Sequence, residues 1–163
     1  MGHLNSLINK ISSLEELTSQ IKIWKSNNEK IVFTNGCFDI LHRGHIELLA
    51  KMADLGNRLI IGLNTDKSIK QIKGEKKPIM DEKSRALLLA SLTFVDAIIL
   101  FSQETPIDLI TAIKPDFLAK GGDYNINKIV GQKIVQKNGG HVIIIPLTEG
   151  FSSSKIINKI KND

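Results

Sequence analysis

The 163-residue chain contains little cysteine and no long apolar run. Its one cysteine, Cys37, excludes an internal disulfide framework and favours a reducing compartment such as the cytoplasm. No apolar run approaches the roughly 18 to 20 residues that a membrane-spanning helix needs. Residues 1–10 lack the charged start, apolar middle and small-residue cleavage site of a signal peptide. We therefore expect a cytoplasmic protein of one compact domain with no membrane partner.

Aromatic residues are also few, at 5%, and their scarcity affects how the charge is interpreted. The 22 basic and 17 acidic residues give a net charge of +5, which fits either a nucleic-acid-binding surface or a basic surface that attracts small anions. Because the lysines are scattered and no aromatic stripe accompanies them, we favour small anionic ligands and expect no nucleic-acid partner. The densest cluster, Lys73, Lys76 and Lys77, lies beside Gly74 and Pro78, which predicts a loop that forms a flap over phosphates.

One helix is predicted near the N-terminus. Ser13 to Glu16 has the form of a capping box, and apolar residues follow at helical spacing, which predicts a helix over 13–27. This helix precedes the repeated units that begin at residue 30. We expect residues 1–28 to be a helical extension of a domain that spans 29–163. The extension should either pack on that domain or contribute to a homodimer.

Five short apolar segments alternate with predicted helices after this extension. The predicted strands cover 30–34, 58–64, 95–101, 116–120 and 141–146. The predicted helices cover 44–55, 81–92, a segment up to 113 with Thr105 as N-cap and Pro106 in its first turn, 128–137, and a final segment that Ser152 can cap. This alternation is typical of an α/β fold with a Rossmann-like, doubly wound, five-stranded parallel sheet flanked by helices. Right-handed crossovers place the carboxyl ends of such strands at one edge, where ligands bind.

The segment TNGCFDILHRGH, residues 34–45, carries the main functional signal because it joins the first predicted strand to a helix. His42 and His45 are three residues apart, so on a first helical turn they lie on one face. Gly44 between them is expected to let a ligand approach the backbone closely, and the free amides of the helix start attract an anion. The segment therefore predicts a polyphosphate pocket with two imidazoles.

A zinc site with Cys37 and Asp39 is the weaker alternative, because a structural site needs four ligands. Neither a G-x-x-x-x-G-K-[ST] loop nor a G-x-G-x-x-G turn is present.

The same segment resembles the HxGH signature of the nucleotidyltransferase superfamily of cytidylyltransferases and adenylyltransferases. Further motifs occur in the order and spacing of that superfamily: Asn64 to Asp66, Lys73-Gly74, Arg85, Lys114 to Asp116, Lys120 to Tyr124 and Glu149 to Ser154. The block KGGDY, residues 120–124, makes the chain most similar to the branch that acts on D-glycero-β-D-manno-heptose 1-phosphate. The resemblance covers roughly residues 28–162. In that branch the domain is often fused to a sugar kinase. This sequence contains no kinase segment, so we expect a stand-alone form.

The resemblance implies a transfer of AMP from ATP to a sugar 1-phosphate, which gives ADP-heptose for lipopolysaccharide core, and pyrophosphate. One alternative is another nucleotidyltransferase, such as a glycerol-3-phosphate cytidylyltransferase or a flavin adenylyltransferase. A different class is a non-catalytic nucleotide-sensing or nucleic-acid-binding module. Glycerol-3-phosphate cytidylyltransferases carry a basic residue three positions before the glycine of the last motif, where this chain has Leu147, and this weakens the cytidylyl alternative.

The resemblance and the motif positions together assign the expected site residues. The expected catalytic residues are His42, His45 and Arg85. The expected nucleotide-binding residues are Thr34, Asn35, Gly36, Cys37, Phe38, Asp39, His42, His45, Lys120, Gly121, Asp123, Tyr124, Phe151, Ser152 and Ser153. The expected acceptor-binding residues are Asp39, Asp66, Lys73 and Arg85, although a surface salt bridge for Arg85 and an Asx-turn for Asp66 are simpler alternatives. Mg²⁺ is the expected cofactor, bound mainly through the nucleotide phosphates and without a protein metal site.

Overall fold

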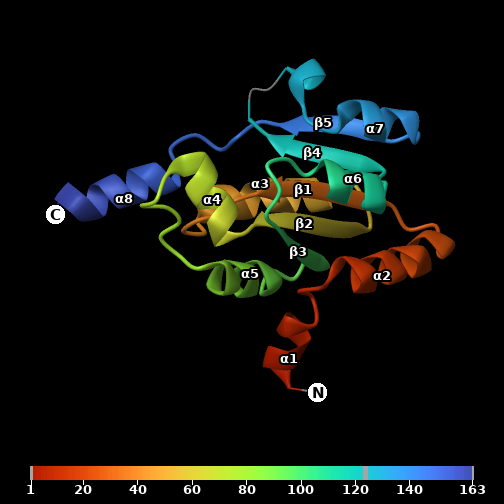
Figure 1. Ribbon diagram of the computed structural model, residues 1–163, viewed down its shortest axis with the longest axis horizontal. Coiled ribbons are helices and arrows are strands. Elements are labelled where there is room, and N and C mark those ends of the chain that lie inside the picture. The colour runs from red at the N-terminus through yellow and green to blue at the C-terminus, as the bar shows by residue number, and fades with distance from the viewer. Residues whose placement is uncertain (1, 123–124, 163) are drawn as a thin grey trace.

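The computed structural model describes residues 2–122 and 125–162 and contains one parallel β-sheet with helices on both faces (Figure 1). The strands are β1 (Ile31–Gly36), β2 (Arg58–Asn64), β3 (Ala97–Phe101), β4 (Phe117–Gly121) and β5 (His141–Ile145). They lie side by side in the order β3-β2-β1-β4-β5, and every neighbouring pair is parallel. The predicted Rossmann-like, doubly wound, five-stranded sheet is therefore confirmed.

Two apolar cores hold the helices against the two faces of the sheet. The helices are α1 (His3–Ile8), α2 (Leu14–Ser26), α3 (Arg43–Ala53), α4 (Asp66–Lys73), α5 (Glu82–Ala90), α6 (Ile107–Ile113), α7 (Gln132–Lys137) and α8 (Ser153–Asn162), with a 3-10 turn η1 (Ile126–Lys128). One core packs α2, α6 and α7 against Ile31 and Phe33 of β1, and the other packs α3 and α5 against Val32. Successive strand residues point to opposite faces, and both faces are covered, so the strands read as continuous apolar runs.

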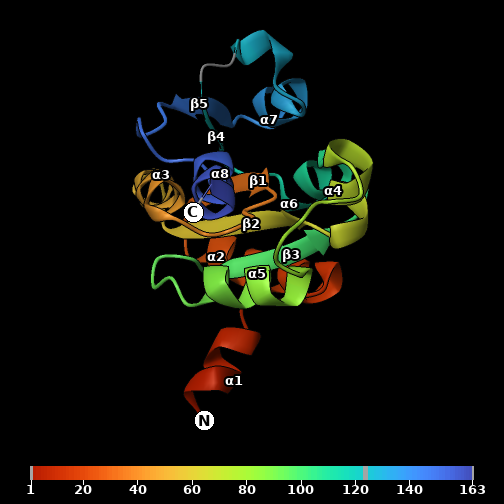
Figure 2. The same cartoon turned by 90° about the vertical axis from the view of Figure 1, so that its left-hand side faces the viewer.

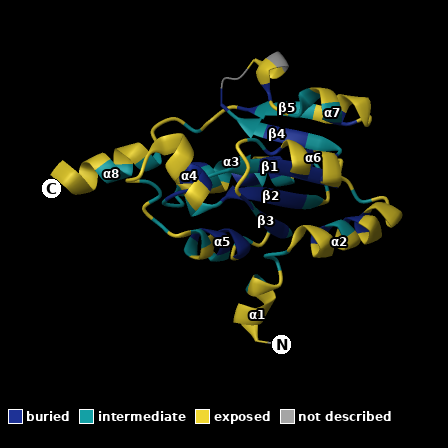
Figure 3. Cartoon of the chain, viewed as in Figure 1, coloured by how far each residue is buried: buried dark blue, intermediate teal, exposed yellow. Residues whose placement is uncertain are grey.

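The N-terminal segment packs on the sheet. This was one of the two expectations for it, the other being a contribution to a homodimer. Ser13 caps α2 in the predicted capping box, with the Glu16 N–H donating to Ser13 Oγ and the Ser13 N–H donating to the Glu16 carboxylate. Three apolar side chains of α2 are buried in the first core: Leu17, Ile21 and Trp24. Residues 10–12 run along the edge strand β3, where the Ser12 N–H donates to the Ile98 carbonyl at 2.9 Å. Figures 2 and 3 show α1 standing away from the sheet with an exposed surface.

Two local expectations are wrong and one holds in part. The expected lysine-rich loop is confirmed over residues 74–80, between α4 and α5, but Lys73 ends the unexpected helix α4, which Thr65 caps by accepting the Ser68 N–H at 3.3 Å. The helix expected over 128–137 is divided, because Gly131 has φ +87° between η1 and α7. The N-cap of α6 is Pro106 and not Thr105. Each difference concerns a helix of eight residues or fewer, which has too few turns for the sequence period to fix its ends.

The strand order creates a crevice at the carboxyl ends of β1 and β4. The chain moves outward from β1 through β2 to β3 on one side, and then continues with β4 and β5 on the other. Crossover connections therefore diverge between β1 and β4, which is where open α/β sheets bind their ligands. Among the residues that the structure describes, no helix is long and apolar enough to cross a membrane.

Candidate active site

A cavity of about 340 Å³ lies at the carboxyl ends of β1 and β4. Its wall combines the β1–α3 junction, the side of α3, the end of α4 with the following loop, the end of β4 and the start of α8. The lining residues are Thr34, Asn35, Gly36, Cys37, Phe38, Asp39, His45, Leu48, Met52, Ile69, Lys73, Lys77, Lys120, Gly121, Leu147, Ser153 and Ser154. Most of the expected nucleotide-binding residues thus meet around one cavity, and their roles there remain proposals.

The two histidines of the HxGH segment face each other at the start of α3. His42 is the N-cap residue, His45 lies in the first turn, and their rings are stacked with centroids 3.9 Å apart. The Nδ1 atoms of both rings are buried, and within the described residues neither has a hydrogen-bond partner. A buried polar atom without a partner costs free energy, so these atoms are poised for a ligand or for water. The expectation that both rings share one face is confirmed.

Burial determines the charge of both rings. It is the largest cause that lowers the pKa of His45 to about 4, and the neighbouring His42 and Lys73 lower it further, while Asp39 opposes them. Burial also lowers the pKa of His42. Since the usual value for histidine is about 6.5, His45 is neutral at pH 7 in the ligand-free protein. A neutral imidazole carries one N–H and can donate one hydrogen bond to a phosphate oxygen.

Gly44 has a packing role that the sequence did not predict. A Cβ atom at this position would lie 2.9 Å from the Cβ of Phe151 and 3.1 Å from Cε1 of His42. The missing side chain therefore makes room for protein atoms, namely the His42 ring and the segment before α8. The expected close approach of a ligand at Gly44 stays a prediction. Phe151 also lies under the Arg43 guanidinium, 5.1 Å from its ring centroid. A smaller cavity of about 180 Å³ separates the ring of His42 from the start of α8.

Three lysines bring positive charge to the larger cavity. Lys73 and Lys77 come from the end of α4 and the loop after it, while Lys120 comes from the end of β4. Burial lowers the pKa of Lys120 to about 8, and its ammonium donates a hydrogen bond to the Asn35 side chain. The sequence predicted Lys120 as a nucleotide-binding residue, but it did not predict the contact with Asn35, because the two residues are 85 positions apart.

Asp39 and two serines fix the walls of this cavity. The Asp39 carboxylate accepts hydrogen bonds from the backbone N–H groups of Ile79 at 2.9 Å and Met80 at 3.0 Å. Ser153 Oγ donates to the Asp39 carbonyl at 2.6 Å, and Ser152 Oγ caps α8 by accepting the Lys155 N–H at 3.2 Å. The carboxylate of Asp39 therefore anchors the loop after α4 against the β1–α3 junction, besides lining the cavity.

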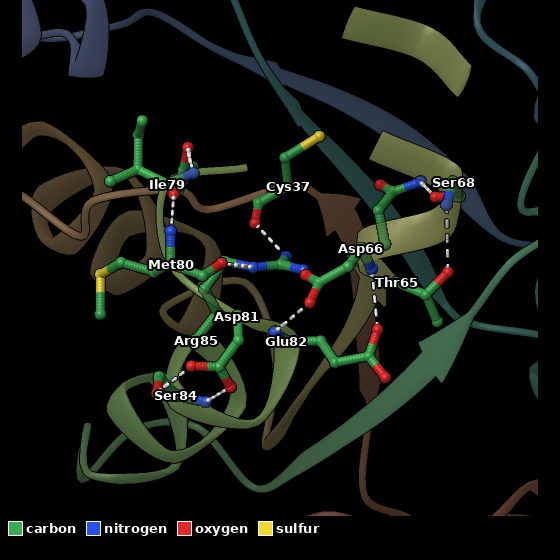
Figure 4. Close-up of polar contacts among 12 residues, drawn as sticks. Cys37, Thr65, Asp66, Ser68, Ile79, Met80, Asp81, Glu82, Ser84 and Arg85 are labelled. Atoms are coloured by element: carbon green, nitrogen blue, oxygen red, sulfur yellow. Dashed lines mark hydrogen bonds and ion pairs between the residues drawn. The ribbon is translucent and has the colours of Figure 1, made fainter. Parts of the chain in front are cut away.

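Asp66 and Arg85 are paired with each other and with neighbouring protein groups (Figure 4), and neither is among the residues that line the cavity. The Arg85 side chain is fully buried, and Nη2 donates to the Asp66 carboxylate at 2.7 Å. The other Asp66 oxygen accepts the Glu82 N–H at 3.1 Å. The full burial of Arg85 contradicts both the phosphate clamp and the surface salt bridge that the sequence suggested. The Asp66 carboxylate accepts hydrogen bonds from protein donors, and its expected contact with sugar hydroxyls stays a prediction.

The remaining expected site residues fall into two groups. Thr34 is buried at the cavity wall, and Cys37 lines the same wall. Asp123 and Tyr124 lie outside the described residues. Within 2–122 and 125–162, no group of three or more His, Cys, Asp or Glu side chains is placed to hold a metal ion.

The fold and the site define an α/β domain whose ligand cavity lies where a doubly wound sheet diverges, with an HxGH segment at its centre. The cytidylyltransferase-like family model matches residues 33–159, and the chain belongs to that family. It is 47% identical over 150 residues to the bifunctional protein HldE of Koribacter versatilis, and 51% identical over 153 residues to that of Campylobacter jejuni. These alignments cover 92% and 94% of this chain but 31% and 32% of the relatives, so the chain spans about a third of their length.

One solved structure is similar in both sequence and fold. The lipopolysaccharide core biosynthesis protein from Thermoplasma volcanium is 32% identical and superposes with a TM-score of 0.59. The match covers 74% of this chain and 97% of that protein. Pantothenate synthetase from Thermus thermophilus, at 16% identity and a TM-score of 0.61, shares the fold alone.

Proposed function

We propose that the chain transfers AMP from ATP to D-glycero-β-D-manno-heptose 1-phosphate and releases pyrophosphate. The observation that carries the proposal is the stacked pair of imidazoles at the start of α3, beside a cavity lined by three lysines. Membership of the cytidylyltransferase-like family supports the reaction class. The KGGDY block and the 47–51% identity to HldE proteins support the heptose acceptor over glycerol 3-phosphate.

The reaction needs positioning and charge stabilisation more than a strong base. An oxygen of the sugar phosphate attacks the α-phosphorus of ATP, the new P–O bond forms, and the bond to the β-phosphate oxygen breaks so that pyrophosphate leaves. The attacking oxygen is already anionic. The main barrier is the approach of two anions and the charge that develops on the transferred and leaving groups, which preorganised donors can stabilise.

The chain supplies such donors from several elements. The neutral rings of His42 and His45 donate N–H groups to phosphate oxygens, and the free amides at the start of α3 add to them. Lys73, Lys77 and Lys120 offset the negative charge that the triphosphate brings. Lys120 has the lowered pKa of a buried ammonium, and a bound anion would favour its charged form.

Mg²⁺ is the cofactor that a triphosphate substrate implies. The cavity offers lysines and imidazoles, and Asp39, the carboxylate on its wall, is occupied by two backbone N–H groups. This donor set suits phosphates better than a bare divalent ion, which prefers oxygen ligands. We therefore propose that Mg²⁺ arrives with the nucleotide and is held by phosphate oxygens and water. We place the reaction in the cytoplasm, where ATP is available, and propose a homodimer as the assembly.

The test is a pyrophosphate-release assay in which ATP and CTP are each paired with heptose 1-phosphate and glycerol 3-phosphate. We expect turnover with ATP and heptose 1-phosphate, and a drop of roughly 10²- to 10³-fold in kcat for His45→Gln, because the flexible glutamine amide does not hold its N–H group where the imidazole holds its own. His141→Gln is the matched control, since His141 lies at the far end of β5 beside Phe117. Preferred turnover of CTP with glycerol 3-phosphate would establish the cytidylyltransferase instead, and absence of turnover with every pair would remove the proposal.

A further inference from the structure

Arg85 is a fully buried arginine that the proposed chemistry leaves without a function. It sits on α5, and its guanidinium donates in three directions (Figure 4). Nε donates to the Met80 carbonyl at 3.0 Å, Nη1 to the Cys37 carbonyl at 2.6 Å and Nη2 to Asp66 at 2.7 Å. Burying a charge is costly unless it is paired and hydrogen-bonded, so all three contacts are needed to keep it there.

The three acceptors belong to three segments that shape the cavity. Cys37 is in the β1–α3 junction, Asp66 opens α4, and Met80 ends the loop between α4 and α5. Asp66 and Glu82 also exchange hydrogen bonds, each carboxylate accepting the other residue's backbone N–H. Arg85 therefore joins the junction to the helix and loop that carry Lys73 and Lys77.

The contact with Cys37 determines the direction of the next amide group. A trans peptide is planar, so its C=O and N–H point in opposite directions. Because the Cys37 carbonyl points at Arg85, the Phe38 N–H points away from it, and Phe38 lines the cavity. Within the described residues no acceptor binds this N–H. Phe38 has φ +47°, a left-handed conformation that residues other than glycine rarely adopt, so the junction needs outside support.

We propose that Arg85 is a positioning residue that turns the Phe38 amide toward the triphosphate of the bound nucleotide and does not itself contact substrate. The inference rests on the proposed function only in placing a nucleotide in this cavity. A guanidinium has donors spread over a planar fork, so it can hold three oxygens in different directions. A lysine ammonium in the same place can pair with Asp66 but cannot reach the other two.

The experiment compares Arg85→Lys with Arg58→Lys, a matched control. Arg58 pairs with Glu29 and Asp96 at the opposite end of the sheet. For Arg85→Lys we expect the KM for ATP to rise by about tenfold to a hundredfold, the range for losing a hydrogen bond to a charged group, with a smaller change in kcat and in the KM for the sugar phosphate. Arg58→Lys should lose stability and keep both KM values. A rise in the KM for the sugar phosphate alone would overturn the proposal. So would the same KM for ATP in Arg85→Lys and Arg58→Lys when the two variants are equally stable.

A measurement on the unaltered protein covers the case in which Arg85→Lys does not fold. The chain has six phenylalanines, so ¹⁵N-phenylalanine labelling gives few amide signals, and Phe38→Tyr assigns the one that matters. Titration with ATP should change the chemical shift of the Phe38 amide strongly. A Phe38 chemical shift that does not change when ATP binds contradicts the proposal. Because this readout needs no acceptor, it separates the inference from the proposed reaction: ATP can bind and shift Phe38 even if heptose 1-phosphate is not turned over.

Discussion

At the scale of the residue, the site depends on side chains whose charge is set by their neighbours. The sequence predicted which histidines matter, because His42 and His45 stand three apart at a strand-to-helix junction. Their neutrality follows from packing. The His45 ring lies against the edge of Phe38, with centroids 5.5 Å apart, and is stacked on His42. Such burial disfavours the charged form of an imidazole, so a basic residue type becomes a neutral donor.

This burial predicts how stability varies with pH. The pKa of His45 is about 4 in the folded chain and about 6.5 when unfolded, so between these values the unfolded chain binds more protons. The free energy of unfolding should therefore fall as the pH falls from about 6.5 to about 4. Thermal unfolding of the wild type and His45→Gln over this range measures the difference, and the variant should lose less stability.

His141→Gln is the control for that comparison, because His141 is exposed and lies at the start of β5, at the opposite end of the sheet from the cavity. Its unfolding profile should follow the wild type. Parallel pH profiles for the wild type and His45→Gln would show that His45 is not buried as the structure has it.

At the scale of the element, the site depends on the packing of α3 against the segment before α8. Gly44 in the first turn of α3 leaves space that the Phe151 side chain and the His42 ring fill. A glycine in a helix is normally destabilising relative to alanine by about 1 kcal/mol. Here the packing makes it necessary, so the usual preference for alanine should be reversed.

Gly44→Ala tests this packing. The helix gains about 1 kcal/mol from alanine, but overpacking costs about 1–3 kcal/mol, so we expect the free energy of unfolding to fall by up to about 2 kcal/mol. Turnover should fall as well, because the His42 ring must move to admit the methyl group. Urea unfolding and the pyrophosphate assay measure both effects. Lys51→Ala, on the exposed side of the same helix, is the control, and a Gly44→Ala variant that is stabilised and fully active contradicts the structure here.

The elements themselves were predictable where the apolar pattern is long. The second strand, residues 58–64, was predicted with the bounds that β2 has, because RLIIGLN is buried almost throughout. The helix α4 was missed since only Ser68 and Ile69 of its residues are buried, which leaves no stripe to recognise. Its position matters, because Lys73 at its end lines the cavity as a helical residue and not as part of a flap.

At the scale of the whole molecule, the N-terminal segment belongs to the packing of the sheet. The proposed boundary after residue 28 falls between α2 and β1, and α2 contributes three buried apolar side chains to the core that Phe33 shares. Truncating one large buried apolar residue commonly costs about 2–5 kcal/mol, and a typical domain has only about 5–15 kcal/mol of stability. Loss of α2 should therefore be severe.

A pair of truncations measures this. A chain of residues 29–163 should unfold at a much lower temperature than the full chain or fail to fold, because Leu17, Ile21 and Trp24 no longer cover the sheet. A chain of residues 10–163 lacks only α1, none of whose residues is buried, and should unfold close to the full chain. Thermal unfolding followed by circular dichroism distinguishes them. A stable 29–163 fragment would show that residues 1–28 are an independent extension.

The sequence by itself determined the α/β class, the five strands and the segment that carries the paired histidines, because these follow from local periodicity and from residue types close together in the chain. Only the tertiary structure decided what Lys120 and Arg85 do. Lys120 meets Asn35 across 85 residues, and Arg85 meets Cys37 across 48. Whether a charged side chain faces solvent, ligand or protein depends on partners that folding brings to it, and no local pattern records them.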